Sequence, residues 1–596
     1  MRTRASLFSR PRRLLLSAAA ALRWLGRLPA ARAAAPAVRP GEPGWPDEAD
    51  WQRLRAATGG ALMRVESPWP AARQDPAEAE RLLRALKNPY FTRDSVALTQ
   101  TLGYVDAWTS QPSAWAVAAR NAQEVAAAVD FARTRRVRLA VKGGGHAYQG
   151  TSNAAGSLLV WTRRMNDAAV HEDFVPEGCA GRLPPQRAVT LGAGAVWGEA
   201  YDAVTTRAGG YVQGGGCMTV GVAGLVQSGG FGSFSKAFGL ASASLLQAEV
   251  VTADGAVRTV NACRDPELFW ALKGGGGGSF GVVTRLTLKV HPLPRTFGAI
   301  EMTVQAASPE AFRRLIARTL GFARTALLDP HWGEQIRLLP GERLQVSMVF
   351  QGLNRAEAGA VWQPFIEAVQ AAPGELRFLS SPLVVGTSAR DFWAPSWIKR
   401  SLGFQARDER PDAPATNVFW PGDQGQAGQV LHGYASTWLP AGLLHGEAPG
   451  ALADALFAAS RESGLSLHFN KGLAGAPPEV LAAARDTAMN PAVLDAFALL
   501  IMGAGEQPAY PGLPGHEPQV ERGRARAAAI RRGMAALRQV VPDGGAYLSE
   551  SDYFQPDWPR AFWGGHHARL LAAKRRYDPD GLFTVHHGVG SEPGVG

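Results

Sequence analysis

The chain has 596 residues and a formal net charge of +11, from 62 Lys and Arg against 51 Asp and Glu. A chain of this length is too long to fold around one small hydrophobic core, and it suggests two or three domains. Hydrophobic residues make up 46% and charged residues 19%, which excludes a mainly disordered chain. Three cysteines exclude a disulfide-rich scaffold and a zinc or iron–sulfur site built from several cysteines. No apolar run is long enough to predict a polytopic membrane protein.

The basic charge is concentrated in residues 1–35, which contain eight arginines and no acidic residue. In the rest of the chain, the numbers of basic and acidic residues are nearly equal. That part shows no basic stripe that would predict nucleic-acid binding. Arg12 and Arg13 precede a leucine- and alanine-rich run, and residues 31–35 offer small-residue cleavage positions. The arginine pair resembles a twin-arginine export signal. We therefore predict a periplasmic or secreted protein; an Arg- and Ala-rich unfolded or organelle-targeting leader is the alternative.

The first half of the chain predicts a mixture of α and β structure. Residues 36–60 are rich in Pro, Gly and Ala and predict a linker, and residues 76–87 have helical spacing. Beyond residue 120, helices are expected over 122–134 and 197–207, and strands over 137–141, 158–161, 188–191, 249–252, 257–260 and 281–290. Asp254-Gly255 predicts that the strands at 249–252 and 257–260 form a hairpin.

Longer strands and helices are expected from residue 296 to about 544. Alternation along residues 344–350 places Leu344, Val346, Met348 and Phe350 on one face, as in a strand with one buried side. Helices are expected over 451–459 and 520–540, and the polar, Pro- and Gly-rich residues 405–428 predict a loop. The last part of the chain is rich in aromatic residues and histidine.

Three glycine clusters mark the candidate site. Residues 143–145 lead into His146, residues 214–216 lead into Cys217, and residues 274–278 form the third cluster. Consecutive glycines let backbone N–H groups approach a ligand closely and form concavities that bind anions such as a pyrophosphate. Turn-forming glycine is the alternative explanation. Three clusters, two of them beside predicted strands, favour a cofactor site.

These segments resemble a known family. Val-Lys-Gly-Gly-Gly-His at 141–146 and Gly-Cys-Met-Thr-Val-Gly-Val-Ala-Gly at 216–224 resemble FAD-linked oxidoreductases of the vanillyl-alcohol oxidase superfamily, and more narrowly its berberine-bridge-enzyme-like branch. Tyr-Leu-Ser-Glu-Ser-Asp at 547–552 and Tyr-Asp-Pro-Asp-Gly-Leu-Phe at 577–583 resemble the C-terminal segment of that branch.

The resemblance implies an α+β fold of two domains, the PCMH-type FAD-binding fold with an antiparallel-sheet substrate domain. A C-terminal segment would return to complete the FAD domain. In chain order, the expected parts are an export signal (1–35), a linker and N-terminal helical segment (36–94), the FAD-binding domain (95–295), the substrate domain (296–544) and the berberine-bridge-like segment (545–592).

The resemblance also implies a doubly attached flavin. In the family, the histidine matching His146 bonds to the 8α-methyl carbon of FAD, and the cysteine matching Cys217 bonds to C6. A turn histidine and a buried small cysteine are the alternatives. Val220 matches a position beside the flavin face, where valine accompanies oxidases. The other residues expected to bind FAD are Lys142, Gly143, Gly144, Gly145, Ala147, Gly216, Thr219, Gly221, Gly224, Gly229, Gly230, Gly232, Gly281, Val282 and Val283.

The catalytic base is the open part of the prediction. Oxidation of an alcohol carbon requires a side chain that takes the hydroxyl proton as the hydride leaves. In the family this group is a Tyr or Glu on the substrate-domain sheet. No counterpart of that Glu is recognised here, so the candidates are Tyr434, His468, Asn470 and Lys471. Strand alternation predicts His468 and Asn470 on one face and Lys471 on the other. Ordinary core or surface polar residues are the alternative for each.

Several positions depart from the family. Ser549 stands where the C-terminal segment commonly has Asn, and His566-His567 where Asn-Tyr is common. These histidines and the pair at 586–587 do not predict a metal, because adjacent residues seldom bind one ion together. Cys179 and Cys263 either pair in an oxidising compartment or stay unpaired and buried.

Together these features predict an exported FAD oxidase. Its substrate would carry a hydroxyl group, as in a sugar, an oligosaccharide or a phenolic or alcohol natural product. The hydride would pass to flavin N5 and the electrons to O2, which yields hydrogen peroxide. No nucleic acid, and no membrane after signal cleavage, is expected as a partner. The alternatives are a dehydrogenase of the same fold with a non-oxygen acceptor, and a non-enzymatic periplasmic binding protein.

Overall fold

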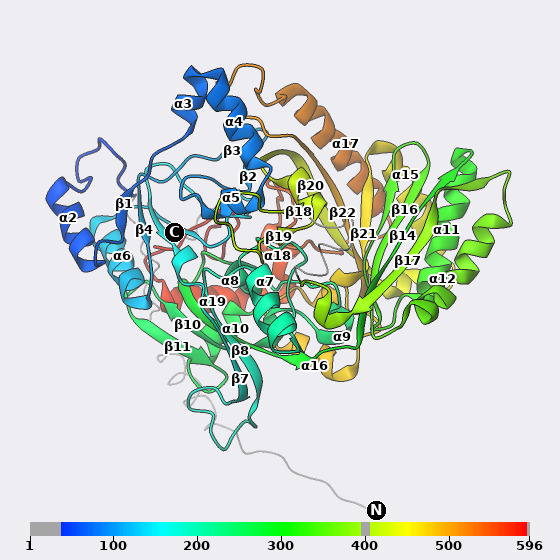
Figure 1. Ribbon diagram of the computed structural model, residues 1–596, viewed down its shortest axis with the longest axis horizontal. Helices are drawn as coiled ribbons and strands as arrows, with labels where there is room; N and C mark the ends of the chain where they lie inside the picture. Colours follow the sequence, from blue (N-terminus) through cyan, green and yellow to red (C-terminus); the bar gives the residue numbers. More distant parts are fainter. Residues whose placement is uncertain (1–36, 395–405, 593–596) are drawn as a thin grey trace, which may run out of the picture.

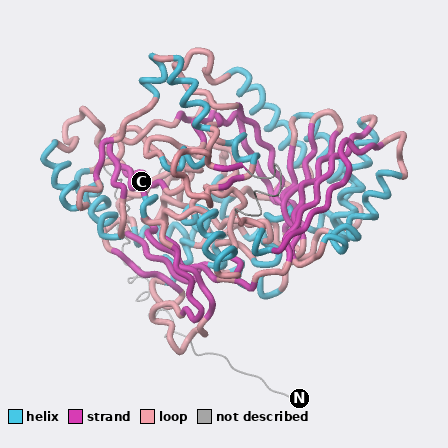
Figure 2. Tube along the Cα trace, in the orientation of Figure 1, coloured by secondary structure: helices cyan, strands magenta, loops and turns pink. Residues whose placement is uncertain are grey.

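The computed structural model describes residues 37–394 and 406–592 (Figure 1). The export signal predicted at 1–35 lies outside the described residues. Within the described residues, no helix is long and apolar enough to cross a membrane. Figure 2 shows the strands gathered into a large sheet on one side of the molecule and smaller sheets on the other.

The first small sheet contains the strand that precedes His146. Its order is β1 (Leu62–Arg64), β4 (Trp115–Ala118), β6 (Leu158–Trp161) and β5 (Leu139–Lys142), and both β4 and β5 run parallel to β6. Helix α6 (Ala122–Arg135) connects β4 to β5 and buries Val125, Ala128, Val129 and Ala132. The side chain of Asn121 caps this helix by accepting a hydrogen bond from the backbone N–H of Glu124 at 2.9 Å.

The second small sheet is antiparallel. Its order is β11 (Val257–Asn261), β10 (Leu245–Val251), β12 (Val282–Lys289), β8 (Gln186–Gly192) and β7 (Ala168–Phe174). The hairpin predicted around Asp254-Gly255 is confirmed as the β10–β11 pair, and Gly255 has a φ of +77°. Helix α7 (Trp197–Tyr201) follows β8 and continues as a wider helical turn over Asp202–Arg207.

The large sheet has nine strands. In spatial order they are β17 (Leu376–Ser388), β14 (Thr296–Ala306), β16 (Arg343–Gln351), β15 (Trp332–Leu339), β21 (Leu465–His468), β22 (Ala496–Glu506), β20 (Gln429–Pro440), β2 (Thr101–Tyr104) and β3 (Trp108–Thr109). Neighbours are antiparallel except β2 and β20, which are parallel. Because β2 and β3 belong to this sheet, part of the predicted FAD-binding range contributes to the substrate side. The domain boundaries stay a prediction.

One face of the large sheet is covered by helices. They are α11 (Pro309–Ala326), α12 (Arg355–Gln370), α15 (Ala448–Glu462) and α17 (Val520–Arg538), on the outer side in Figure 1. The predicted alternation along β16 is confirmed, because Leu344, Val346, Met348 and Phe350 are all fully buried in the core beneath these helices. The intervening side chains therefore point to the opposite face, which carries no helices of this group.

The C-terminal segment packs against the third glycine cluster. It contains α18 (Trp558–Trp563) and α19 (His567–Tyr577). The indole N–H of Trp563 donates to the carbonyl of Gly274 at 3.0 Å, and Lys574 Nζ donates to the carbonyl of Ser279 at 2.8 Å. A segment that follows the large sheet in sequence thus returns to the small-sheet side of the molecule.

Two regions that were predicted as coil contain helices or strands, so these two predictions are wrong. The predicted linker contains the helix α2 (Glu48–Ala57), which begins with a capping box formed by Asp47 and Asp50. The high Pro and Gly content of the region favoured a linker over this short helix. The described part of the predicted loop contains the short strands β18 (Ala406–Arg407) and β19 (Val418–Phe419) and the helix α14 (Pro421–Gln426). These elements are too short for a periodic pattern, and tertiary burial of the β19 side chains stabilises them.

The question of Cys179 and Cys263 is settled in favour of pairing. The two cysteines form a disulfide with a Cα–Cα distance of 5.7 Å, across a sequence separation of 84 residues. Cys217 is the free cysteine.

Candidate active site

A cavity of about 1470 Å³ lies between the glycine clusters and the helix-free face of the large sheet. All three clusters contribute to its wall, as do strands β14, β15, β16, β20, β21 and β22 and the C-terminal segment. An ordinary ligand pocket has about 300–1,000 Å³. The volume here is sufficient for a cofactor and a substrate together.

The glycine side of the cavity depends on close backbone packing. A Cβ atom on Gly144 would lie 2.5 Å from the carbonyl oxygen of Thr219 and 2.6 Å from the nitrogen of Gly221. Only glycine therefore allows these two segments to touch. Gly216 and Gly277 differ, because a Cβ there would meet nothing within 4 Å. These two positions leave open space along the wall.

His146 stands on this wall. Its Nε2 atom lies 3.0 Å from the hydroxyl oxygen of Thr219, which is fully buried. Burial lowers the pKa of His146 to about 4. The imidazole is therefore neutral at neutral pH and keeps a lone pair on one ring nitrogen, as a nucleophile requires.

Cys217 lines the same cavity, and so does Asp423 of α14, whose negative charge acts on the thiol. Burial, together with the negative charge of Asp423, raises the pKa of the Cys217 thiol well above its usual value. Burial also raises the pKa of Asp423 to about 6.

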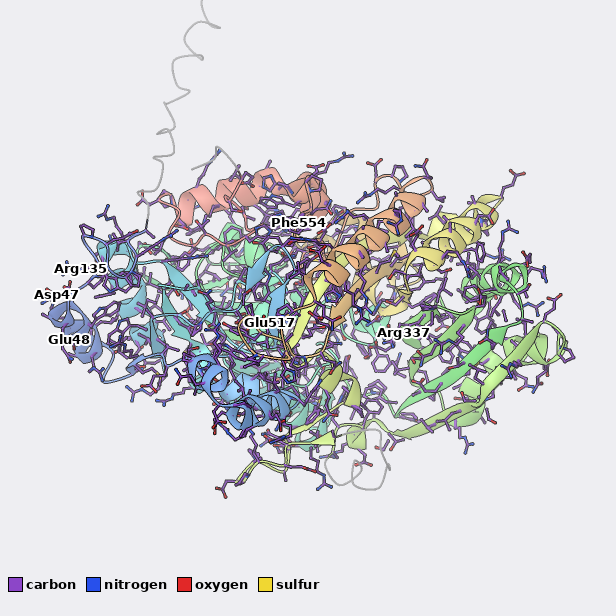
Figure 3. All side chains as sticks on the ribbon, turned by 90° about the horizontal axis from the view of Figure 1, so that it is seen from above. Asp47, Glu48, Arg135, Arg337, Glu517 and Phe554 are labelled. Atoms are coloured by element: carbon purple, nitrogen blue, oxygen red, sulfur yellow. A yellow bond between two sulfur atoms is a disulfide. The ribbon has the colours of Figure 1, made fainter. Side chains whose placement is uncertain are left out.

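Charged side chains line the sheet side of the cavity. Lys471 Nζ lies 2.6 Å from each carboxylate oxygen of Glu550, and both side chains are largely buried. On β15, Glu334 accepts a hydrogen bond from the hydroxyl of Ser233 at 2.6 Å. Arg337 projects from the same strand, and Figure 3 places it between the large sheet and the middle of the molecule. The glycine side of the cavity therefore carries the nucleophiles His146 and Cys217, and the sheet side carries charged side chains.

Comparison with known proteins shows the family of the chain. The family of the FAD binding domain matches residues 113–261, and the berberine and berberine-like family matches residues 546–590. The FAD-linked oxidoreductase malF of Malbranchea aurantiaca is 30% identical over 579 residues, which cover 92% of this chain and 91% of malF.

The chain belongs to the FAD-linked oxidoreductases.

Solved structures agree with this assignment at the level of the fold. The VAO-type flavoprotein MtVAO615 of Myceliophthora thermophila C1 superimposes with a TM-score of 0.75 at 23% identity, over 94% of this chain and 98% of that one. The glucooligosaccharide oxidase of Acremonium strictum superimposes with a TM-score of 0.60 at 20% identity, over 81% and 91%. The predicted α+β, two-domain fold and the berberine-bridge-like resemblance are confirmed.

An FAD-linked oxidoreductase needs a site with backbone open to a pyrophosphate and a flat space for the flavin ring. The open positions at Gly216 and Gly277 and the large cavity beside them meet both needs. Most of the predicted FAD-binding residues line this cavity: Gly143, Gly144, Gly145, His146, Ala147, Gly216, Cys217, Val220, Gly221, Gly224, Gly281 and Val283.

Six predicted FAD-binding residues do not line the cavity: Lys142, Thr219, Gly229, Gly230, Gly232 and Val282. Lys142 is buried and donates to the carbonyls of Ser95, Val96 and Leu98 at 2.7–3.0 Å, so it fastens a neighbouring loop. Thr219 lies behind the cavity wall, where its hydroxyl contacts the His146 ring. The other four pack against protein atoms or lie in the core.

All four predicted catalytic candidates line the cavity, namely Tyr434, His468, Asn470 and Lys471. The predicted alternation of the last three is wrong. Strand β21 ends at His468, and a tight 3₁₀ turn over Phe469–Lys471 replaces the expected strand. This turn rotates the backbone, so that His468, Asn470 and Lys471 all reach the same cavity.

Four charged residues that line the cavity were not predicted from the sequence: Glu334, Arg337, Asp423 and Glu550. Glu550 lies within the C-terminal motif already recognised at 547–552, so its position beside the site could have been expected. Asp423 lies in the region predicted as a loop. Glu334 has a φ of +65° within a strand, which no local sequence signal indicates.

The histidine pairs do not form a metal site. Across residues 37–394 and 406–592, no three His, Cys, Asp or Glu side chains gather to hold an ion. One histidine of each pair is engaged by a backbone carbonyl: His566 Nδ1 lies 2.9 Å from the oxygen of Met489, and His586 Nε2 lies 2.8 Å from that of Tyr553.

Proposed function

We propose that the protein is an exported oxidase with FAD attached through both His146 and Cys217. It oxidises a hydroxyl-bearing carbon of a sugar, an oligosaccharide or a phenolic or alcohol natural product. The observation that carries the proposal is the meeting of two nucleophiles and a carboxylate–ammonium pair, Glu550 and Lys471, around one cavity. When bound, the flavin supplies a hydride acceptor at N5.

Attachment would use Nδ1 of His146, because Nε2 is already in contact with Thr219. The Acremonium strictum glucooligosaccharide oxidase is described as carrying a 6-S-cysteinyl, 8α-N1-histidyl FAD. The neutral imidazole of His146 and the free thiol of Cys217 are the two groups that such a pair of links would need. Two links would hold the flavin without enclosing it, and the remaining cavity stays available to the substrate.

Glu550 is the group we propose to take the hydroxyl proton. Its carboxylate faces the cavity, and Lys471 fixes both of its oxygens. His468 is a weaker candidate, because burial and the nearby positive charges of Lys471 and Arg337 lower its pKa well below its usual value. Burial raises the pKa of Tyr434 well above its usual value, so it stays a neutral phenol. Both can still orient a substrate by hydrogen bonds.

The wall opposite the flavin suits a polar substrate. Gln335 and Arg337 on β15 and Ser347 on β16 line the cavity, and Arg337 Nε donates to Gln335 Oε1 at 3.1 Å. Amide, guanidinium and hydroxyl groups can hydrogen-bond several hydroxyls of one ligand. A sugar or oligosaccharide is therefore the substrate class that this wall favours.

Oxygen is the proposed electron acceptor. Val220 lines the cavity three residues after Cys217, at the position where the family resemblance associates valine with oxidases. A dehydrogenase with a different acceptor remains the second candidate, and oxygen uptake during turnover separates the two.

Export is proposed from two independent features. The N-terminal Arg12-Arg13 pair resembles a twin-arginine signal, and the Cys179–Cys263 disulfide suits an oxidising compartment.

Double attachment predicts flavin that survives denaturation. After acid precipitation, we expect the wild-type pellet to be yellow and its intact mass to include one FAD. His146→Ala and Cys217→Ala should each retain flavin through the other link, and the double variant should lose it. Free flavin in the wild-type supernatant would contradict covalent attachment.

Proton transfer to Glu550 predicts a specific loss in turnover. Glu550→Gln should lower kcat by about 10²–10⁴-fold while covalent flavin is retained, because the amide cannot accept the proton. Oxygen uptake and peroxide release would be measured with glucose, glucose oligosaccharides and benzylic phenols. The matched control is Asp543→Asn, an exposed carboxylate nearby in sequence, which should keep wild-type kcat. A Glu550→Gln enzyme with wild-type kcat would exclude this role.

Twin-arginine export predicts that Arg12→Lys/Arg13→Lys protein stays in the cytoplasm. Wild-type protein should appear in the periplasm or medium, with Cys179 and Cys263 oxidised. Fractionation of a bacterial host that has the pathway would show this, and identical distributions of the two proteins would refute twin-arginine export.

A further inference from the structure

Cys217 faces a carboxylate that the oxidation reaction does not use. Asp423 is 6% exposed, and its carboxylate lines the cavity beside Cys217, where its charge acts on the thiol. Its Oδ2 atom is buried and has no hydrogen-bond partner. A buried carboxylate with an unsatisfied oxygen carries a desolvation cost, and its persistence at a nucleophile calls for an explanation.

The surrounding fold holds this carboxylate in place. The indole N–H of Trp420 donates to the carbonyl of Gly216 at 2.9 Å, which joins the start of α14 to the residue before Cys217. The backbone N–H of Asp423 donates to the carbonyl of Trp420 at 2.9 Å. Behind them, the hydroxyl of Tyr90 donates to the carbonyl of Val418 at 2.9 Å. These bonds hold the segment that carries Asp423 against the segment that carries Cys217.

We propose that Asp423 is the general base for the attachment of Cys217 to the flavin, accepting the thiol proton as the sulfur bonds to C6. The inference rests on the proposed double attachment and adds a residue to it. In the overall step, the S–H bond and the C6–H bond break and the S–C6 bond forms. Two electrons and two protons leave to dioxygen, which becomes hydrogen peroxide. Asp423 carries the thiol proton on the first part of that path.

A base is needed because the free thiolate is scarce at this site. The thiolate is the nucleophilic form of cysteine, and the protein raises the pKa of Cys217 well above its usual value. Asp423, with a pKa of about 6, is mostly ionised at neutral pH. Proton transfer in concert with bond formation avoids the unfavourable free thiolate.

Other charged groups near Cys217 are committed elsewhere. The positive charge of Lys471 favours the thiolate, but its ammonium is paired with Glu550. The negative charge of Glu334 opposes the thiolate, and its carboxylate is bound by Ser233. Of the two carboxylates whose charge acts on the thiol, Asp423 has the larger effect.

The test compares the extent of each flavin link in full-length protein purified at several times after induction. Peptide masses give the fraction of chains with flavin on Cys217 and on His146. Asp423→Asn should lower the Cys217-linked fraction at least about tenfold at early times, with the His146-linked fraction unchanged. Asp423→Glu should restore part of the Cys217 link. Glu301→Gln, which removes a cavity carboxylate bonded to Ser347, should attach both links as wild type does.

The His146 link reports that the flavin site of each variant has assembled. A Cys217-linked fraction in Asp423→Asn equal to wild type at every time would overturn the proposal. Loss of both links in Asp423→Asn would also overturn it, because the role assigned here is confined to Cys217. A wild-type protein without the Cys217 link would instead refute the double attachment on which the inference rests.

Discussion

The site depends on one close contact between two backbone segments. Gly144 meets Thr219 and Gly221 at a distance that no side chain would permit. Further backbone bonds reinforce this arrangement, because the N–H of Trp197 donates to the carbonyl of Val220 at 3.1 Å and that of Val222 to the carbonyl of Ala195 at 3.0 Å. Since His146 and Cys217 each lie within a few residues of the contact, it brings two nucleophiles from distant parts of the sequence to one wall.

The two walls of the cavity have different physical characters. The small-sheet side provides glycine backbone, a neutral imidazole and a thiol, and it can hold a flat ring closely. The large sheet buries apolar residues under its helices, so its strand alternation directs polar residues such as Ser347 into the cavity. The C-terminal segment then adds Glu550 to pair with Lys471. The proposed function therefore places cofactor attachment and substrate chemistry on opposite walls, which different parts of the chain supply.

Sequence reasoning predicted the parts that local patterns determine. The α6 helix, the β10–β11 hairpin and the buried face of β16 follow from helical spacing, turn chemistry and alternation, and the structure has all three. The family resemblance supplied the two-domain fold and pointed to His146 and Cys217. Both residues line the cavity.

The rest depends on tertiary contacts that no window of sequence contains. The turn that brings Lys471 to Glu550 joins residues 79 apart in sequence. Asp423 belongs to a six-residue helix, and the Trp420 indole fastens the start of this helix to the carbonyl of Gly216. Because this bond joins distant parts of the chain, composition alone suggested a loop. The pairing of Cys179 with Cys263 likewise needed the spatial distance between them.

The most direct measurement is a crystal structure of the purified, flavin-loaded protein. The account predicts one isoalloxazine ring in the cavity, with continuous electron density to His146 Nδ1 and to Cys217 Sγ, and with Glu550 on the open side of the ring. A flavin bound elsewhere, or a ring in this cavity without density to either residue, would contradict the central claim.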